Sequence, residues 1–132
     1  MPIQNSIERS TQVLVYTGGV VKAYRRGTDV FSKIEKTWNE MTREAFPMPA
    51  FGVSIDSLTR EEMKEGIWVE FLFEKETECD GMPFERLLVA VKPDYHGFNL
   101  IRFTSGGYNG RCFYLDLREK TMQNFYSMLE TL

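Results

Sequence analysis

Between residues 11 and 25 apolar and polar positions alternate along the chain, which is typical of β-strands with two different faces. Val13 and Val15 fall on one face of this segment and Tyr16 falls on the other. The pair Gly18-Gly19 interrupts the alternation. The segment is therefore either a hairpin with a two-residue turn or one long strand with a bulge.

Two segments repeat apolar residues at helical spacing. The first begins after Thr28, a good N-cap residue, and ends at Phe46, because Pro47 and Pro49 cannot continue a helix. Its apolar stripe is Val30, Ile34, Trp38, Met41 and Ala45. The second begins near Arg118, with the stripe Thr121, Phe125, Met128, Leu129 and Leu132. Both are predicted to be amphipathic helices with one buried face.

The remaining chain reads as short strands separated by turns. Strands are predicted at 51–55, 67–73, 87–92, 99–104 and 111–117. A loop at 76–83 contains the turn signal Asp80-Gly81, which makes 67–92 an antiparallel hairpin. In the polar stretch between the first two strands, Thr59 and Glu62 fit a capping box for a short helix. Gly106-Gly107 and Asn109-Gly110 compete as turns, so the register at 105–110 stays open.

This order of elements predicts the α+β class. Strands joined by short turns pair antiparallel, and two helices with one apolar stripe each pack on one face of the resulting sheet. We expect a mostly antiparallel sheet of about five to seven strands. Residues 1–10 are polar and aperiodic and are expected to form a flexible arm, followed by a single domain over 11–132.

Composition narrows the choice of partners and of compartment. The 132 residues are 42% hydrophobic and carry a net charge of −3, without the basic excess typical of nucleic-acid-binding proteins. No apolar run approaches the length of a membrane span and no basic leader precedes an apolar stretch. Two cysteines, Cys79 and Cys112, are too few for a disulfide framework and indicate reduced thiols. We therefore expect a cytoplasmic protein that binds neither nucleic acid nor membrane.

The residues that usually carry catalysis or bind metals are sparse. His96 is the one histidine, in a loop, and the histidine and two cysteines are too scattered to bind zinc. No phosphate-binding or dinucleotide-binding motif is present, and the glycines at 106–110 read as turn residues between strands. The acidic run Glu74–Asp80 reads as a solvated hairpin end. We predict no catalytic residue, no metal and no cofactor.

Glu70 is the one unusual residue, because it stands in the middle of an apolar strand. Trp68 and Glu70 are two residues apart and so share a face. In one interpretation this face is exposed and Glu70 pairs with a lysine or arginine on the next strand. In the other, the face lines a pocket whose aromatic wall and carboxylate suit a cationic or aromatic ligand. The pKa of a covered Glu70 should rise unless a cation approaches it. Further strand aromatics that the register could add to the pocket are Tyr16, Tyr24, Tyr108 and Tyr114.

The stretch from Gln12 to Phe73 resembles the first half of the gyrase-inhibitor-like (GyrI-like) small-molecule-binding family. The matching features are a strand, a helix carrying Trp38, Phe51-Gly52-Val53, a polar insert, and Trp68-Val69-Glu70-Phe71. The resemblance implies two strand-helix-strand-strand units in one sheet, with a ligand cleft that contains an acidic residue among aromatics. The C-terminal half departs, with three strands before its helix and, by this resemblance, two fewer strands after it. If the Glu70 face is exposed, a partner chain would supply the missing strands.

Two functions compete on these grounds. The first is a non-catalytic cytoplasmic domain that binds a small organic ligand through Trp68, Glu70 and Tyr16, with Tyr24 and Tyr114 joining them. The alternative is a homo-oligomeric interaction or regulatory module, in which an apolar surface forms a homodimer. A ligand-shaped concavity near Trp68 favours the first function, and a flat apolar patch favours the second.

Overall fold

The computed structural model describes residues 2–48 and 52–132. Along the chain the elements are η1 (a 3-10 helix, Ile3–Arg9), β1 (Ser10–Thr17), β2 (Val20–Arg25), α1 (Asp29–Thr42), β3 (Phe46–Met48), β4 (Val53–Ser54), α2 (Asp56–Glu62), β5 (Ile67–Cys79), β6 (Met82–Val91), β7 (Gly97–Phe103), β8 (Gly110–Arg111), β9 (Phe113–Asp116) and α3 (Gln123–Glu130).

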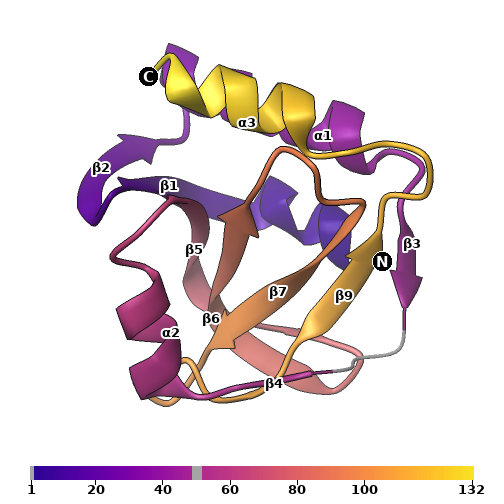
Figure 1. The fold of residues 1–132 in the computed structure, drawn as a ribbon. Coiled ribbons are helices and arrows are strands. Elements are labelled where there is room, and N and C mark those ends of the chain that lie inside the picture. The colour runs from indigo at the N-terminus through magenta and orange to yellow at the C-terminus, as the bar shows by residue number, and fades with distance from the viewer. Residues whose placement is uncertain (1, 49–51) are drawn as a thin grey trace.

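Seven strands form one antiparallel sheet in the order β2-β1-β5-β6-β7-β9-β3, and β4 pairs separately with β8 (Figure 1). Two-residue turns make the first two hairpins, at Gly18-Gly19 and Asp80-Gly81. All four turn residues have positive φ, the conformation that favours glycine and aspartate in such turns. The helices and this sheet confirm the predicted α+β class, and the Gly18-Gly19 segment is a hairpin.

The second hairpin is longer than the sequence predicts. Residues 76–79 and 82–83, expected in a loop, belong to the ends of β5 and β6, where 77–79 pair with 82–84. The charged side chains there are exposed, whereas Cys79 and Met82 pack against the main core and Phe84 is buried in it, so one face of the hairpin end still contacts the core. A register shift between Leu72 and Thr77 separates the buried part of β5 from this more exposed part.

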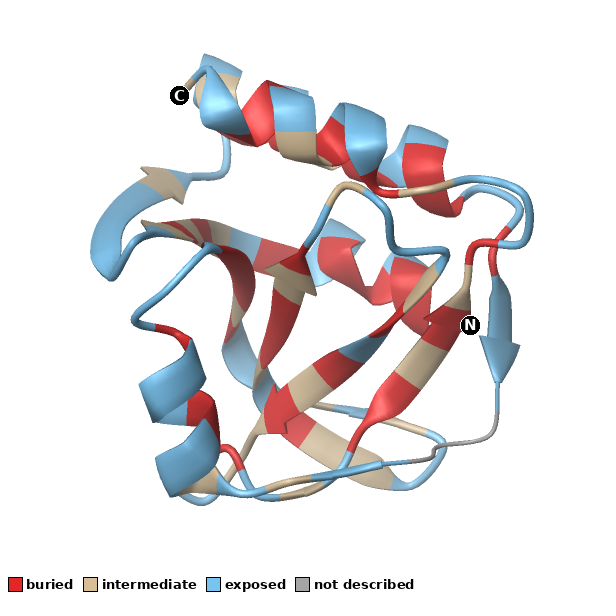
Figure 2. Cartoon of the chain, viewed as in Figure 1, coloured by how far each residue is buried: buried red, intermediate tan, exposed pale blue. Residues whose placement is uncertain are grey.

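Helices α1 and α3 lie together against one face of the sheet, as predicted (Figure 1). The Thr28 side chain caps α1 by accepting a hydrogen bond from the Phe31 backbone N–H at 3.3 Å. Trp38 of α1 is fully buried, and its ring meets Phe71, Phe98 and Phe125 edge-on at 5.2, 5.6 and 5.9 Å. Figure 2 shows buried residues on both helices and along the strands beneath them. This aromatic group holds the two helices to the sheet.

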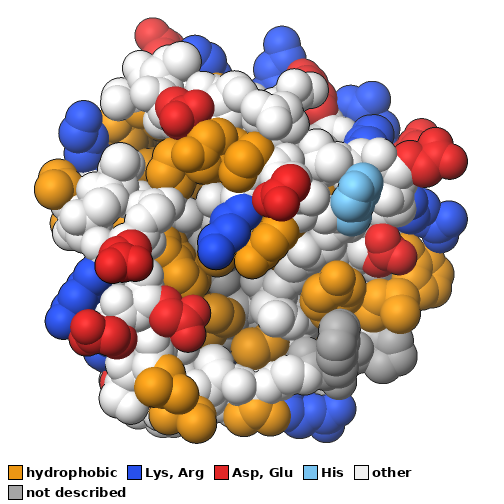
Figure 3. All heavy atoms as spheres, viewed as in Figure 1, with side chains coloured by type: hydrophobic (Ala, Val, Ile, Leu, Met, Phe, Trp, Pro, Cys, Tyr) orange, Lys and Arg blue, Asp and Glu red, His pale blue; other side chains and the backbone are white. Residues whose placement is uncertain are grey.

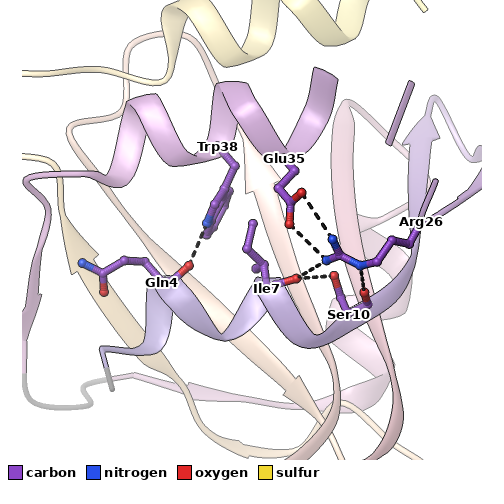
Figure 4. Close-up of polar contacts among 6 residues, drawn as sticks. All are labelled: Gln4, Ile7, Ser10, Arg26, Glu35 and Trp38. Atoms are coloured by element: carbon purple, nitrogen blue, oxygen red, sulfur yellow. Dashed lines mark hydrogen bonds and ion pairs between the residues drawn. The ribbon is translucent and has the colours of Figure 1, made fainter. Parts of the chain in front are cut away.

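The N-terminal segment differs from the predicted flexible arm. Ile3–Arg9 is a 3-10 helix, and Ile3 and Ile7 are buried in the main core. The Trp38 indole N–H donates to the Gln4 carbonyl at 3.0 Å (Figure 4). The sequence pattern misses this helix because Ile3 and Ile7 are its two apolar residues, which is too few to show a periodic stripe.

One arginine also fastens this segment to the hairpin and to α1. The Arg26 guanidinium donates to the Ser10 and Ile7 carbonyls at 2.7 and 3.0 Å. The same guanidinium forms an ion pair with Glu35 of α1 at 3.0 Å (Figure 4). Through these charge-assisted hydrogen bonds, Arg26 joins the end of η1 and the start of β1 to α1.

Two predictions for residues 46–66 need correction. The helix there begins at Asp56, so Thr59 is not a cap but a buried residue inside α2. The first helix, expected to end at Phe46, ends at Thr42, and Phe46–Met48 form the edge strand β3, which pairs with β9. The strand predicted at 51–55 is observed as β4 at Val53–Ser54, and Phe51 lies outside the described residues.

Candidate functional site

The face of the sheet opposite α1 and α3 carries the candidate site. Strand register places Tyr16 of β1 opposite Trp68 of β5, and Glu70 opposite Leu88 of β6. Their neighbours Val13, Val15, Val69 and Phe71 point to the helix-covered core. Because successive side chains of a strand alternate between faces, the residues between them lie on the opposite face.

Glu70 is fully buried on this second face, at 0% exposure. Its Oε1 accepts a hydrogen bond from the Tyr16 hydroxyl at 2.8 Å, and its Oε2 accepts one from the Tyr108 hydroxyl at 2.5 Å. Arg86 Nη1 of the adjacent strand β6 lies 3.5 Å from Oε1. Both carboxylate oxygens are therefore satisfied by the protein, and the negative charge has a cationic partner.

Glu70 combines parts of both interpretations of the sequence. It pairs with an arginine on the next strand, as expected for an ordinary strand glutamate. Its face is nevertheless covered, as expected for a pocket. The covering residues come from α2 and from the loop that carries Tyr108, which the strand pattern alone does not place.

The two tyrosines are held as hydrogen-bond donors. Burial, and then the negative charge of Glu70, raise the pKa of both Tyr16 and Tyr108 well above the usual tyrosine range. An ionised phenolate beside a buried carboxylate would bring two like charges together in a poorly solvated place. Both hydroxyls therefore keep their protons.

Tyr108 is positioned by a contact between its loop and the start of α2. Asp56 Oδ1 accepts a hydrogen bond from the Tyr108 backbone N–H at 2.8 Å, and Asn109 Oδ1 accepts one from the Asp56 backbone N–H at 2.9 Å. The hydrogen bond from the Tyr108 N–H, and after it one from the Arg60 side chain, lower the pKa of Asp56. A Cβ on Gly107 would lie 2.8 Å from the Asn109 side chain, so the close approach needs glycine.

Arg60 of α2 completes this contact. Its Nε donates to both Asp56 oxygens at 2.9 and 2.8 Å. Its guanidinium also lies over the Tyr108 ring, 5.2 Å from the ring centre. Arg60 thus orients the Asp56 carboxylate, which holds the loop of Tyr108 in place. Arg60 also covers the ring of Tyr108, whose hydroxyl donates to Glu70.

A hollow of about 400 Å³ lies over this cluster, and we call it the tyrosine hollow. It is lined by Tyr16, Gly19, Arg60, Met63, Lys64, Arg86, Phe103 and Tyr108. The Arg86 guanidinium lies 4.9 Å from the centre of the Phe103 ring, and the Phe103 and Tyr108 rings meet edge-on at 4.9 Å. The hollow therefore combines aromatic walls with cationic side chains.

Trp68 lines a different hollow, which also borders α2. This tryptophan hollow, of about 230 Å³, is lined by Glu62, Trp68, Ala90, Tyr95, Gly97, Phe98, Asn99, Ile101 and Tyr114. A wider hollow of about 560 Å³ shares Trp68, Ala90 and Tyr95 with it. In Figure 3 apolar side chains form several separate groups over the visible face, with charged side chains between and around them. The Trp68 indole N–H donates to the Glu65 carbonyl at 2.9 Å.

The five predicted ligand-binding residues are therefore divided. Tyr16 and Glu70 belong to one hydrogen-bonded cluster, while Trp68 and Tyr114 line the tryptophan hollow. Tyr24 pairs with Val13 and packs against the helix-covered core, so it lies on the other face of the sheet.

Sequence reasoning did not single out Arg86, Asp56, Arg60, Met63 or Phe103. Arg86 lies on the same face as Glu70, but counting residue pairs from the Asp80-Gly81 turn does not place it there, because β5 contains a register shift between Leu72 and Thr77. Asp56 and Arg60 act through Tyr108, 52 residues from Asp56 along the chain, and no local pattern signals that contact.

The other groups with potential chemistry have structural surroundings. His96 Nδ1 lies 3.2 and 3.1 Å from the Arg118 and Lys120 carbonyls, which fixes the segment before α3. Burial raises the pKa of the Cys79 and Cys112 thiols. Over residues 2–48 and 52–132, no group of three or more His, Cys, Asp or Glu side chains could hold a metal ion.

No helix in the described part of the chain is both long and apolar enough to cross a membrane. Comparisons of the chain with protein-family models, with curated proteins and with solved structures gave no match. The resemblance of residues 12–73 to the GyrI-like family therefore stays a prediction.

Proposed function

We propose that this chain is a cytoplasmic, non-catalytic domain that binds a small aromatic molecule in the tyrosine hollow. One observation carries the proposal: a fully buried carboxylate, two tyrosine hydroxyls and an arginine are assembled directly beneath an open hollow. A buried ionic cluster adds little stability compared with a well-packed apolar core. A buried group of titratable residues at the base of a surface cavity is typical of a functional site.

The walls of the hollow suit an aromatic ring. Tyr16, Phe103 and Tyr108 supply ring faces and edges, and Met63 supplies a flexible apolar surface. The volume of about 400 Å³ falls within the range that small-molecule sites occupy. A ligand of one or two fused rings would cover these walls and the Arg86 guanidinium at their edge.

Binding without catalysis agrees with the groups that the hollow presents. Its lining contains no cysteine, histidine, serine or carboxylate among the described residues. The raised pKa of Tyr16 and Tyr108 keeps both hydroxyls protonated, so they are poor proton donors and no phenolate is present to act as a base. These groups can orient a ligand by hydrogen bonds, but they lack an activated nucleophile or base.

The proposal is tested by a thermal-shift screen of neutral bicyclic aromatics against the wild type and two leucine variants. Phe103→Leu removes a ring wall of the hollow, while Phe46→Leu removes an exposed phenylalanine on the edge strand β3. We expect at least one compound to raise the melting temperature of the wild type and of Phe46→Leu. The same compound should stabilise Phe103→Leu less, because ring contacts contribute about 0.5–1.5 kcal/mol. Equal stabilisation of all three proteins would contradict this site.

A further inference from the structure

We infer that the tyrosine hollow selects an aromatic anion, and that Arg86 is the residue that receives its negative group. The inference rests on the proposed function and adds the charge class of the ligand. It is carried by three features: the charges that line the hollow, the unused donors of Arg86, and the inaccessibility of Glu70.

The charged residues that line the hollow are all cationic. Arg60, Lys64 and Arg86 contribute to the described lining, and no aspartate or glutamate does. Each cation has a carboxylate partner, namely Asp56, Glu61 and Glu70 in that order. None of these carboxylates lines the hollow, so a ligand would meet the positive side of each pair at short range.

Arg86 is prepared to accept an anion. Its side chain is 37% exposed and its guanidinium lies against the Phe103 ring. It approaches Glu70 at 3.5 Å as an ion pair, and no hydrogen bond from its guanidinium is found within residues 2–48 and 52–132. A guanidinium carries five N–H donors in a planar fork that matches a carboxylate, and a ring behind it limits its motion.

Glu70 itself is closed to a cationic ligand. Its exposure is 0%, and its two oxygens accept from Tyr16 and Tyr108. A cation could reach it only by displacing Arg86 or one of the tyrosines. The carboxylate instead holds Arg86 in place over Phe103 at the edge of the hollow.

The test compares three ligands with one aromatic frame: 1-naphthoate, 1-naphthalenemethanol and 1-naphthylmethylammonium. Binding is measured by titration calorimetry with the full chain. We expect the dissociation constant of naphthoate to be lower than that of the ammonium compound by about tenfold or more. Arg86→Met retains an unbranched stem beside Phe103. It should weaken naphthoate binding about tenfold and leave the neutral alcohol nearly unchanged.

A second pair of variants keeps the test independent of the folding of Arg86→Met. Lys64→Glu reverses an exposed charge at the hollow, and Lys33→Glu reverses an exposed charge on α1. The dissociation constant of naphthoate should be about threefold to tenfold higher for Lys64→Glu than for the wild type. For Lys33→Glu it should equal that of the wild type. Equal or tighter binding of the ammonium compound would overturn the inference and leave the proposed function standing. Absence of binding by all three compounds would contradict the proposed function itself.

Discussion

At the scale of single residues, the cost of burying Glu70 decides how its neighbours must behave. A carboxylate removed from water loses several kcal/mol of solvation unless donors replace the water. Two tyrosine hydroxyls and one guanidinium meet this carboxylate in the sheet. Hydrogen bonds to a charged group contribute about 1.5–3 kcal/mol each, so the two tyrosine hydrogen bonds, together with the Arg86 ion pair, are comparable in size to the penalty. Loss of any one should be costly.

The first prediction is that Glu70→Gln destabilises the protein by about 2–4 kcal/mol. The amide keeps the shape but removes the charge that Arg86 and both tyrosines face. It also turns one acceptor into a donor that points at a tyrosine hydroxyl. Urea unfolding monitored by circular dichroism measures the change. The matched control is Glu85→Gln, an exposed glutamate on β6, which should change stability by less than about 0.5 kcal/mol. An unchanged urea midpoint for Glu70→Gln would mean that the cluster does not hold together as described.

The second prediction concerns alkaline pH. The pKa values of Tyr16 and Tyr108 are raised in the folded protein, whereas the unfolded chain has ordinary tyrosines that ionise near pH 10. Above that pH the unfolded state loses protons that the folded state keeps, so stability falls as pH rises. The double variant Tyr16→Phe/Tyr108→Phe should be less stable at pH 8, and its stability should decline less steeply from pH 10 to 11. Parallel declines in urea unfolding for the two proteins would contradict the raised pKa values.

At the scale of elements, short connections fix which side chains meet. The two-residue turn at Gly18-Gly19 pairs Thr17 with Val20 and therefore Val13 with Tyr24, which places Tyr24 on the helix-covered face. If the hairpin is chosen over the bulged strand, the sequence alone predicts that Tyr24 lies on the same face as Val13. Counting residue pairs outward from the Asp80-Gly81 turn does not give the partner of Arg86 in β6. The reason is a register shift in β5 between Leu72 and Thr77.

The N-terminal 3-10 helix gives the third prediction. Ile7 is 1% exposed and belongs to the main core, so Ile7→Ala should destabilise the protein by about 2–4 kcal/mol. Glu8→Ala, at the exposed neighbouring position, is the control and should have little effect. Urea unfolding of both variants measures the difference. If the two variants were equally stable, residues 3–9 would be the flexible arm that their polar composition suggests.

At the scale of the whole molecule, the two faces of the sheet are covered unequally. α1, α3 and η1 cover one face, while the short α2 and the loop at 105–110 lie over the other among the residues that the structure describes. The sequence predicts the covered face well, since Trp38 and Phe125 stand on strong helical stripes. It predicts the second face poorly, because Tyr108 and Asp56 meet across 52 residues through loop contacts that leave no periodic pattern. The hollows lie on this partly covered face.

The most direct test of the central claim is where an aromatic ligand binds. Titration of the ¹⁵N-labelled protein with 1-naphthoate, followed by two-dimensional NMR, reports every backbone amide. We predict saturable shifts concentrated at Gly19, Lys64 and Gly107, which line or adjoin the tyrosine hollow, and small shifts on α1. Shifts centred on Trp68 and Tyr95 would place the ligand in the tryptophan hollow, and shifts on β2 that depend on protein concentration would indicate self-association. Either result, or no saturable shift at all, would contradict the account.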